Sequence, residues 1–221
     1  MPDRMGVIFD VDGVLVDSYH AHFDSWQIVA RAEGFEFTER RFVDTFGRTT
    51  RDILREVLDS ARATDSEIER LDSMKETAFR EILSSNFPVM DGAKELIDAC
   101  ASAGFRLAVG SSGPPENVQL VLRSLGRQQV FQGVVNGMDV TRGKPDPQVF
   151  LLAAERLGLA PSRCVVIEDA PFGIEAAHRA GTKCIGFVSR GHTRDELRDA
   201  DQRVDRLQEI SPATIRELIG G

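Results

Sequence analysis

The sequence predicts an α/β fold, a doubly wound parallel sheet that carries a small helical domain. Short apolar runs, which are typical of buried strands, recur along the chain and alternate with helical patterns from residue 92 onward. The helical patterns end near glycines, which commonly stop helices. Residues 18–86 carry helical patterns without a convincing strand. Strands that alternate with helices indicate parallel βαβ units, and the strand-free stretch indicates a helical insert between two of them.

Each predicted strand is an apolar run that ends in polar residues. The first run, Gly6–Phe9, ends at Asp10, and a weaker run covers Val134–Val135. The remaining runs, each with the polar residues that follow it, are Arg106–Gly110 before Ser111, Cys164–Ile167 before Glu168 and Asp169, and Cys184–Val188 before Ser189. In open parallel sheets the ligand binds beyond the carboxyl ends of the strands, where these polar residues are expected to lie.

The predicted helices between these strands cover residues 92–103, 114–125, 147–157 and 172–180. In the first of them, apolar side chains recur on one face at helical spacing. In the second, prolines occupy the start, where they suit the first turn. Both features favour amphipathic helices packed on the sheet.

Residues 18–86 form the predicted helical insert. Its helical stretches are Ser18–Glu33, Asp52–Ser60 and Asp65–Leu83, and Phe87–Val89 is the expected return linker. The predicted domains are therefore a core of residues 1–17 and 87–221 and a second domain of residues 18–86.

The bulk composition limits the classes of partner. The chain has 221 residues and a formal net charge of −8, so binding to nucleic acid or to an anionic membrane surface is not expected. The start of the chain lacks the apolar stretch of a signal peptide, and no apolar run approaches the length of a membrane span. Cys100, Cys164 and Cys184 share no metal-ligand spacing, so we expect buried, reduced thiols in a cytoplasmic protein. A monomer is the default expectation.

The first chemical motif is the pair Asp10 and Asp12, followed by Gly13. If the strand continues, both carboxylates point to the same side of it. Such a pair suits a metal site, or a nucleophile with a general acid/base. A solvated strand end or a local turn is the alternative.

The segment Phe9–Ser18 resembles the first motif of the haloacid dehalogenase superfamily of phosphotransferases. The other motifs of that family follow in order, namely Ser111 after the second strand, a lysine motif at Gly143–Pro147 and an acidic motif at Ile167–Ile174. The resemblance spans nearly the whole chain. It implies a Rossmann-like core with a small helical cap, and residues 18–86 have the position of that cap.

The resemblance implies roles for the acidic residues. Asp10 is expected to attack phosphorus and form an aspartyl-phosphate, and Asp12 to act as general acid and base. A Mg²⁺ cofactor is expected on the Asp10 carboxylate, the Asp12 main-chain carbonyl and Asp169. Glu168 is expected to be either a further ligand or a partner of the ligands. For Asp169 alone, a helix-capping role is the alternative.

The resemblance also implies phosphate-binding roles for Ser111 and Lys144, with main-chain amides near Ser112 assisting. Lys144 is expected to pair with both Asp10 and the phosphate. Taken alone, a lysine before proline is a solvated loop residue, and Ser111 is a turn residue.

Within the superfamily, the chain looks most like β-phosphoglucomutases and related sugar-phosphate phosphatases. His22 is then expected to orient Asp12, and Lys75 to reach substrate oxygens. For His22 and Lys75 the alternatives are a partly buried helix residue and a solvated helix face. Trp26 is most simply explained by packing within the cap.

The sequence departs from the mutases where these bind a second phosphate. Thr50 stands at the position of a cap arginine, for which Arg48 and Arg51 are possible substitutes, and Gly113–Pro115 lack the side-chain donors of a Ser-Lys-Asn run. Hydrolysis needs only one phosphate site and a water, so we expect a phosphatase that acts on a small phosphorylated metabolite, a sugar phosphate. A phosphosugar mutase and a non-catalytic phosphate- or metal-binding module are the alternatives.

Overall fold

The computed structural model describes residues 4–59 and 63–220 of the chain. Within these residues a single parallel sheet has six strands in the order β3-β2-β1-β4-β5-β6. The strands are β1 (Gly6–Phe9), β2 (Arg106–Gly110), β3 (Phe131–Val135), β4 (Cys164–Glu168), β5 (Lys183–Phe187) and β6 (Gln202–Val204). β1 lies in the middle of the sheet and pairs with β2 and β4, which brings the carboxyl ends of these three strands to one edge.

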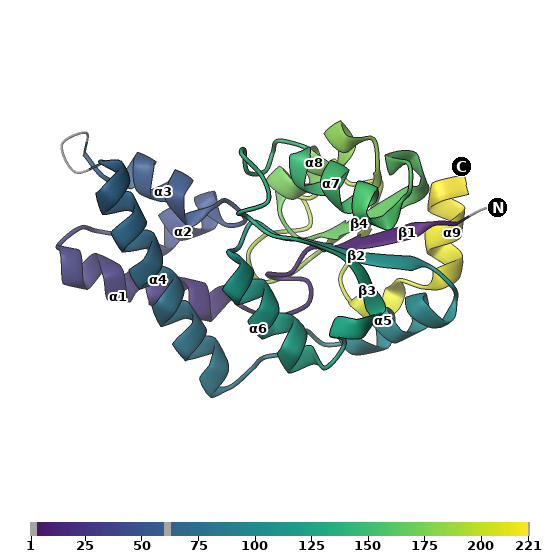
Figure 1. The fold of residues 1–221 in the computed structure, drawn as a ribbon, viewed down its shortest axis with the longest axis horizontal. Coiled ribbons are helices and arrows are strands. Elements are labelled where there is room, and N and C mark those ends of the chain that lie inside the picture. The colour runs from purple at the N-terminus through teal and green to yellow at the C-terminus, as the bar shows by residue number, and fades with distance from the viewer. Residues whose placement is uncertain (1–3, 60–62, 221) are drawn as a thin grey trace.

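Helices cover both faces of the sheet, as Figure 1 shows. Val7 and Phe9 pack on one face, whose helices are α5 (Ala93–Ser102), α6 (Pro115–Leu125) and α9 (Pro212–Gly220). Ile8 packs on the opposite face, whose helices are α7 (Gln148–Leu157) and α8 (Pro171–Ala180). Alternate side chains of a strand point to opposite faces, so one short apolar run supplies two cores. The predicted doubly wound α/β fold is confirmed.

The helical insert, residues 18–86, lies at one end of the molecule (Figure 1). Its helices are α1 (Tyr19–Glu33), α2 (Glu39–Thr45), α3 (Thr50–Val57) and α4 (Asp65–Ser85). They enclose an apolar cluster of their own, in which the Trp26 ring stacks on Phe37 with centroids 4.4 Å apart. Trp26 is buried, as the packing interpretation requires.

Five elements differ from the expectations. α2, α9 and β6 were not predicted, and β3 extends from Phe131 where only Val134–Val135 was expected. β6 and β3 are the edge strands, so each pairs on one side only and has a mixed rather than continuous apolar sequence. The helix predicted over Asp52–Ser60 begins earlier, at Thr50, because the Thr49 hydroxyl accepts a hydrogen bond from the Asp52 amide. Ser60 lies outside the described residues.

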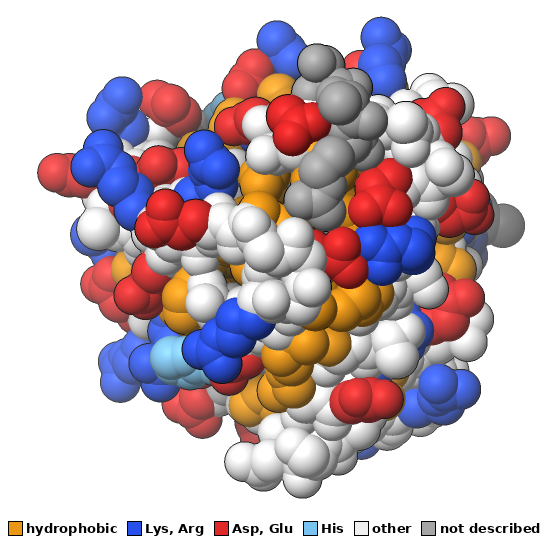
Figure 2. Space-filling model, turned by 90° about the vertical axis from the view of Figure 1, so that its left-hand side faces the viewer, with side chains coloured by type: hydrophobic (Ala, Val, Ile, Leu, Met, Phe, Trp, Pro, Cys, Tyr) orange, Lys and Arg blue, Asp and Glu red, His pale blue; other side chains and the backbone are white. Residues whose placement is uncertain are grey.

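The surface and the cysteines agree with the composition. On the face of the molecule in Figure 2, acidic and basic side chains are interspersed around a strip of apolar ones, so this face offers no continuous basic patch. Cys100, Cys164 and Cys184 are buried and free, as predicted. Among the described helices, none combines the length and apolar character needed to cross a membrane.

Candidate active site

The end of β1 delivers two carboxylates. Asp10 follows the strand directly, and its amide donates to the Ile167 carbonyl of β4 at 3.0 Å. The backbone then leaves the sheet and turns at Gly13, whose φ is 80°. The strand therefore ends before Asp12. The expectation that both carboxylates point to the same side of the strand required it to continue, so that expectation is not met. Both carboxylates nevertheless line one cavity of about 610 Å³ between the helical insert and the core.

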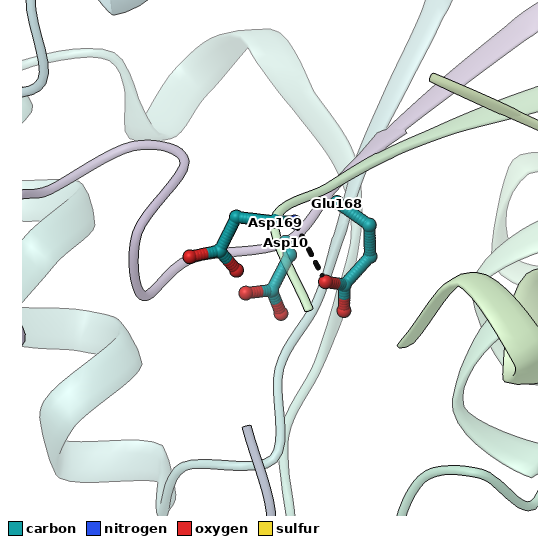
Figure 3. Close-up of side chains that lie close together, drawn as sticks. All are labelled: Asp10, Glu168 and Asp169. Atoms are coloured by element: carbon teal, nitrogen blue, oxygen red, sulfur yellow. Dashed lines mark hydrogen bonds between the residues drawn. The ribbon is translucent and has the colours of Figure 1, made fainter. Parts of the chain in front are cut away.

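The end of β4 brings a second pair of carboxylates to the first. Carboxylate oxygens of Asp10, Glu168 and Asp169 all lie within 4.8 Å of one another, and the three residues are buried. Figure 3 shows the three side chains gathered at the ends of β1 and β4. The prediction that polar residues after neighbouring parallel strands meet at one sheet edge is met by this cluster.

Lys144 neutralises part of this charge. It lies in the loop between β3 and α7, and its Nζ donates to Asp10 Oδ1 at 2.6 Å and to Glu168 Oε1 at 2.5 Å. The ammonium also lies 4.9 Å from the centre of the Phe150 ring. Its side chain is 2% exposed, so the interpretation of Lys144 as a solvated loop residue is wrong.

The electrostatics of the cluster reflect burial and crowding. The pKa of the Asp10 carboxyl is raised to about 8, and burial is the largest cause. The nearby charges of Glu168 and Asp12 raise this pKa further, and the opposing effect of Lys144 is smaller than the sum of these causes. Burial and the charges of Glu168 and Asp10 likewise raise the pKa of Asp169 well above its usual range. Burial alone would lower the pKa of Lys144, but the Asp10 and Glu168 carboxylates raise it. The carboxylates therefore lack enough positive charge nearby to ionise easily.

These residues fit a divalent cation. Glu168 is already fully engaged, because Oε1 accepts from Lys144 and Oε2 accepts from the Asp169 and Ala170 amides at 2.8 Å each. Asp169 Oδ2 accepts from Ser189, which leaves one oxygen of Asp169 and one of Asp10 without such a bond among the described residues. Hard carboxylate oxygens with a surplus of negative charge suit Mg²⁺. The capping interpretation of Asp169 gains no support, since α8 has no side-chain cap bond.

The carboxylate of Asp12 is held from the helical insert. Oδ1 accepts a hydrogen bond from Ser18 Oγ at 2.7 Å and contacts His22 Nε2 at 3.1 Å. Burial raises the pKa of Asp12, but His22, Ser18 and Lys75 together lower it further, so the net pKa lies below its ordinary value. Asp10 and Asp12 therefore occupy opposite electrostatic environments, which suits different chemical roles.

Ser111 and Ser112 follow β2 but face different neighbours. Ser111 is buried, and its Oγ accepts from the Gly113 amide at 3.0 Å. Ser112 Oγ donates to the Gly47 carbonyl at 3.1 Å, so it connects the core to the helical insert, and Ser112 lines the cavity.

The predicted substrate residues of the insert all line the cavity, but each already has partners. Arg48 pairs with Glu56 at 2.7 Å, and Arg51 pairs with Asp72 at 2.9 Å. Lys75 is 2% exposed and contacts His22 Nδ1 at 2.8 Å, so a solvated helix face is excluded for it.

The sequence assigned no individual role to several residues of the site. They are the hydrogen-bonding partners Ser18, Ser189, Thr50, Glu76 and Asn117, and Gly173 of α8. Gly173 did carry a signal, since a glycine inside a helix is unfavourable unless space requires it. A Cβ at that position would overlap the Glu168 carboxylate. The other five are ordinary polar residues. Ser18 bonds to Asp12 six positions before it, whereas Ser189, Thr50, Glu76 and Asn117 bond to residues at least 20 positions away.

Gly13 supports a first prediction. A Cβ there would overlap the Asp169 carboxylate, and φ is 80°. We expect Gly13→Ala to lower the free energy of unfolding by about 1–3 kcal/mol more than the strain of an alanine at positive φ does alone. The additional loss arises because the new Cβ displaces a buried side chain. Chemical denaturation measures this. Gly104→Ala is the matched control, with φ at 84° and nothing within 4 Å of the added Cβ. Equal losses in the two variants would show that the overlap is relieved without cost.

Comparisons with known proteins agree with this geometry. The haloacid dehalogenase-like hydrolase family model matches residues 5–181. A phosphorylated carbohydrates phosphatase of Thermotoga maritima is 35% identical over 182 residues, which cover 81% of this chain and 82% of that protein. A β-phosphoglucomutase of Bacillus subtilis is 29% identical over 186 residues, 81% of each chain. The crystal structure of a β-phosphoglucomutase from Clostridium difficile has a TM-score of 0.88 at 23% identity and covers 98% of this chain and 97% of its own.

The family match extends over most of the chain. It includes the strand ends and loops that supply Asp10, Asp12, Ser111, Lys144, Glu168 and Asp169. The sheet order and the acidic cluster at the sheet edge are observations of the structure that do not depend on any relative. Together they lead to one conclusion: this chain is an enzyme of the haloacid dehalogenase-like hydrolase family.

Proposed function

We propose that this enzyme is a Mg²⁺-dependent phosphatase that hydrolyses a small phosphate monoester, a sugar phosphate, through an aspartyl-phosphate on Asp10. The observation that carries the proposal is the placing of Asp10 at the cavity, with Lys144 on one of its oxygens and Asp12 lining the same cavity. The relatives named as phosphatases of phosphorylated carbohydrates and of fructose 1-phosphate support the substrate class.

In the first step, a carboxylate oxygen of Asp10 attacks phosphorus and the bond from phosphorus to the ester oxygen breaks. Lys144 donates to the Asp10 carboxylate and so directs the nucleophile. Asp12 gives its proton to the departing alcohol oxygen. Ser111 and the amides near Ser112 bind the phosphoryl oxygens.

In the second step, a water molecule attacks the aspartyl-phosphate while Asp12 removes its proton, and inorganic phosphate leaves Asp10. The lowered pKa of Asp12 favours the carboxylate that this step needs. A bound dianionic phosphate raises the pKa of a neighbouring carboxyl by repulsion of like charge, which favours the protonated form needed in the first step. Asp12 therefore exchanges one proton in each half of the cycle.

Asp10, Asp169 and the main-chain carbonyl of Asp12 would hold the Mg²⁺. When bound, the ion offsets the repulsion between the anionic nucleophile and the anionic phosphate. We assign Glu168 to the positioning of Lys144 rather than to the metal, because hydrogen bonds occupy both of its oxygens.

The helical insert acts in this proposal as a cap over the site, and the core comprises residues 1–17 and 87–221. Residues of the insert line the cavity opposite Asp10, including His22, Arg48, Arg51 and Lys75. Arg48 and Arg51 form ion pairs, which present both hydrogen-bond donors and acceptors to the hydroxyls of a sugar. A cap of this kind excludes water from the reaction and contacts the part of the substrate remote from phosphorus.

A phosphosugar mutase is the second candidate, favoured by the likeness to proteins named β-phosphoglucomutase. A mutase must also bind the far phosphate of a bisphosphate intermediate. The insert arginines that line the cavity are engaged by carboxylates, since Arg48, Arg51 and Arg55 pair with Glu56, Asp72 and Asp52. Hydrolysis needs one phosphate site only, so we favour the phosphatase.

Phosphate release from a panel of sugar phosphates tests the proposal. We expect release with Mg²⁺, and a loss of at least about 100-fold when EDTA removes the ion, because several kcal/mol of charge stabilisation are lost. Restoring Mg²⁺ in excess of EDTA is the control and should return full activity. Full activity in EDTA would contradict the metal assignment.

The same panel separates the two candidates. Conversion of β-glucose 1-phosphate to glucose 6-phosphate with an added bisphosphate primer, without net phosphate release from any compound, would favour the mutase.

A further inference from the structure

A buried chain of polar contacts extends from Asp12 into the helical insert and back to the core. His22 Nε2 contacts Asp12 Oδ1 at 3.1 Å, and His22 Nδ1 contacts Lys75 Nζ at 2.8 Å. Lys75 Nζ donates to Glu76 Oε1 at 3.0 Å, and Glu76 Oε2 accepts from Asn117 Nδ2 at 2.5 Å. Asn117 belongs to α6 of the core, so the chain crosses between core and insert at both of its ends.

The donors and acceptors in this chain of polar contacts determine which nitrogen of the His22 ring carries the proton. A lysine ammonium can only donate, so Nδ1 of His22 must accept from Lys75. The proton of a neutral imidazole then resides on Nε2, which donates it to Asp12. The orientation and tautomer of His22 at Asp12 therefore depend on a charged Lys75 behind it.

Glu76 is the counter-charge of Lys75 and holds its ammonium in place. The two side chains are 2% and 8% exposed, and a buried ammonium without a counter-charge is costly. Burial raises the pKa of Glu76, but Lys75, His22 and Thr50 lower it further, so the net pKa lies below its ordinary value. Lys75 also lies over the Phe79 and Trp26 rings, 5.1 and 5.8 Å from their centres, which fixes its direction further.

Glu76 itself is oriented from two directions. Thr50 Oγ1 donates to Oε1 at 2.5 Å from the start of α3, and Asn117 donates to Oε2 from the core. Asn117 in turn accepts from Arg80 at 3.0 Å, which fixes its amide so that the NH₂ group faces Glu76. Glu76 can make all of these bonds only when the insert lies against α6.

We propose that Glu76 is a positioning residue that couples the docking of the helical insert on the core to the orientation of His22 at Asp12. The proposal rests on the proposed phosphatase function, in which Asp12 is the general acid and base. Asn117 is its anchor on the core. Glu76 is buried at the wall of the cavity, and in this proposal it acts on Asp12 through Lys75 and His22 and not on the reacting atoms.

Glu76→Gln tests the proposal by kinetics. The change removes the charge beside Lys75 at constant size, so we expect kcat to fall about tenfold or more as general acid and base catalysis weakens. KM for the sugar phosphate should stay within about threefold, because glutamine has the size of glutamate and the cavity keeps its shape. Glu81→Gln is the matched control, since Glu81 is exposed on the same helix. An unchanged kcat, or a rise in KM with an unchanged kcat, would overturn the proposal.

The imidazole spectrum of His22 gives a test that needs no activity. Long-range ¹H–¹⁵N correlation spectra show which ring nitrogen carries the proton, and His22→Gln identifies the His22 signals among the four histidines. We expect the Nε2–H tautomer in the wild type and its loss in Glu76→Gln. An unchanged His22 spectrum would overturn the proposal for Glu76, whether or not a phosphatase substrate is found. Failure to find any phosphatase substrate would refute the proposed function and not the role of Glu76.

A double variant separates positioning from folding. In Glu76→Gln the new amide faces the Asn117 amide, whereas adding Asn117→Asp restores a donor–acceptor pair across the interface. We expect the double variant to recover any thermal stability that Glu76→Gln loses, while kcat stays low because the full charge beside Lys75 is still missing. Recovery of kcat along with stability would show that Glu76 acts only by holding the interface, and would overturn the route through Lys75.

Discussion

Asp10→Asn is expected to lower phosphate release by at least about 10,000-fold, because the amide cannot attack phosphorus and no other described carboxylate takes its place. Asp169 accepts from Ser189, and Glu168 is occupied by Lys144 and two amides. The amide oxygen of asparagine can still accept the Lys144 hydrogen bond, so the shape of the site is retained. The rate of phosphate release at saturating substrate and Mg²⁺ is the measurement.

The stability of the same variant distinguishes lost chemistry from lost structure. The pKa of Asp10 is raised from 3.8 to about 8, so the folded metal-free protein holds this proton more tightly than the unfolded chain does. The stability of the wild type therefore falls as pH rises from about 4 to about 8 through ionisation of this group. Asparagine removes that cost, so in EDTA near neutral pH we expect the Tm of the variant to equal or exceed that of the wild type.

Asp17→Asn is the control for Asp10→Asn. Asp17 lies in the same segment and pairs with exposed Arg190 at 2.8 Å. Surface pairs contribute little, so this variant should retain activity and stability. Residual activity of Asp10→Asn near that of the wild type would exclude Asp10 as the nucleophile.

Lys144→Met is expected to reduce both activity and stability. Methionine keeps the apolar packing against Phe150 but removes the one cation that the structure places on both Asp10 and Glu168 among the described residues. Removing one partner of a buried ion pair costs about 3 kcal/mol, because the other charges stay buried without compensation. Loss of a charge that directs the nucleophile and binds the phosphate is expected to lower kcat/KM by about 100- to 1,000-fold.

Chemical denaturation and initial rates measure these two effects. Lys183→Met is the matched control, since Lys183 pairs with Asp201 at 3.1 Å on the surface and its side chain is 42% exposed. The control should change neither quantity appreciably. Wild-type kcat/KM in Lys144→Met would show that the lysine is structural only, whereas wild-type stability with low activity would show that the carboxylates tolerate its loss by taking up protons.

The central strands were predictable because they are buried on both faces. β1, β2, β4 and β5 have continuous or nearly continuous apolar sequences that end abruptly at polar residues. β6 was missed because an edge strand of three residues with a glutamine and an arginine has no such signature. α2 was missed because seven residues give only two turns in which to show a periodic pattern.

The sequence by itself determined which residues gather at the sheet edge. The apolar runs placed Asp10, Glu168 and Asp169 at the carboxyl ends of predicted strands, and the pairing of β1 with β4 in the structure then brings them together. Lys144 was placed with them through the resemblance to the family, since nothing local in its loop distinguishes it from a solvated lysine.

The resemblance to the family predicted the contact of His22 with Asp12, but only the tertiary structure decided how His22 itself is supported. The chain of polar contacts from His22 through Lys75 and Glu76 to Asn117 includes a contact between residues 53 positions apart. Each of these residues is an ordinary polar residue in its own helix, with no local pattern that marks it. Whether such side chains meet depends on how α4 packs against α1 and α6. That packing is set by the apolar faces of the helices, so the sequence around each polar residue carries no record of its partner.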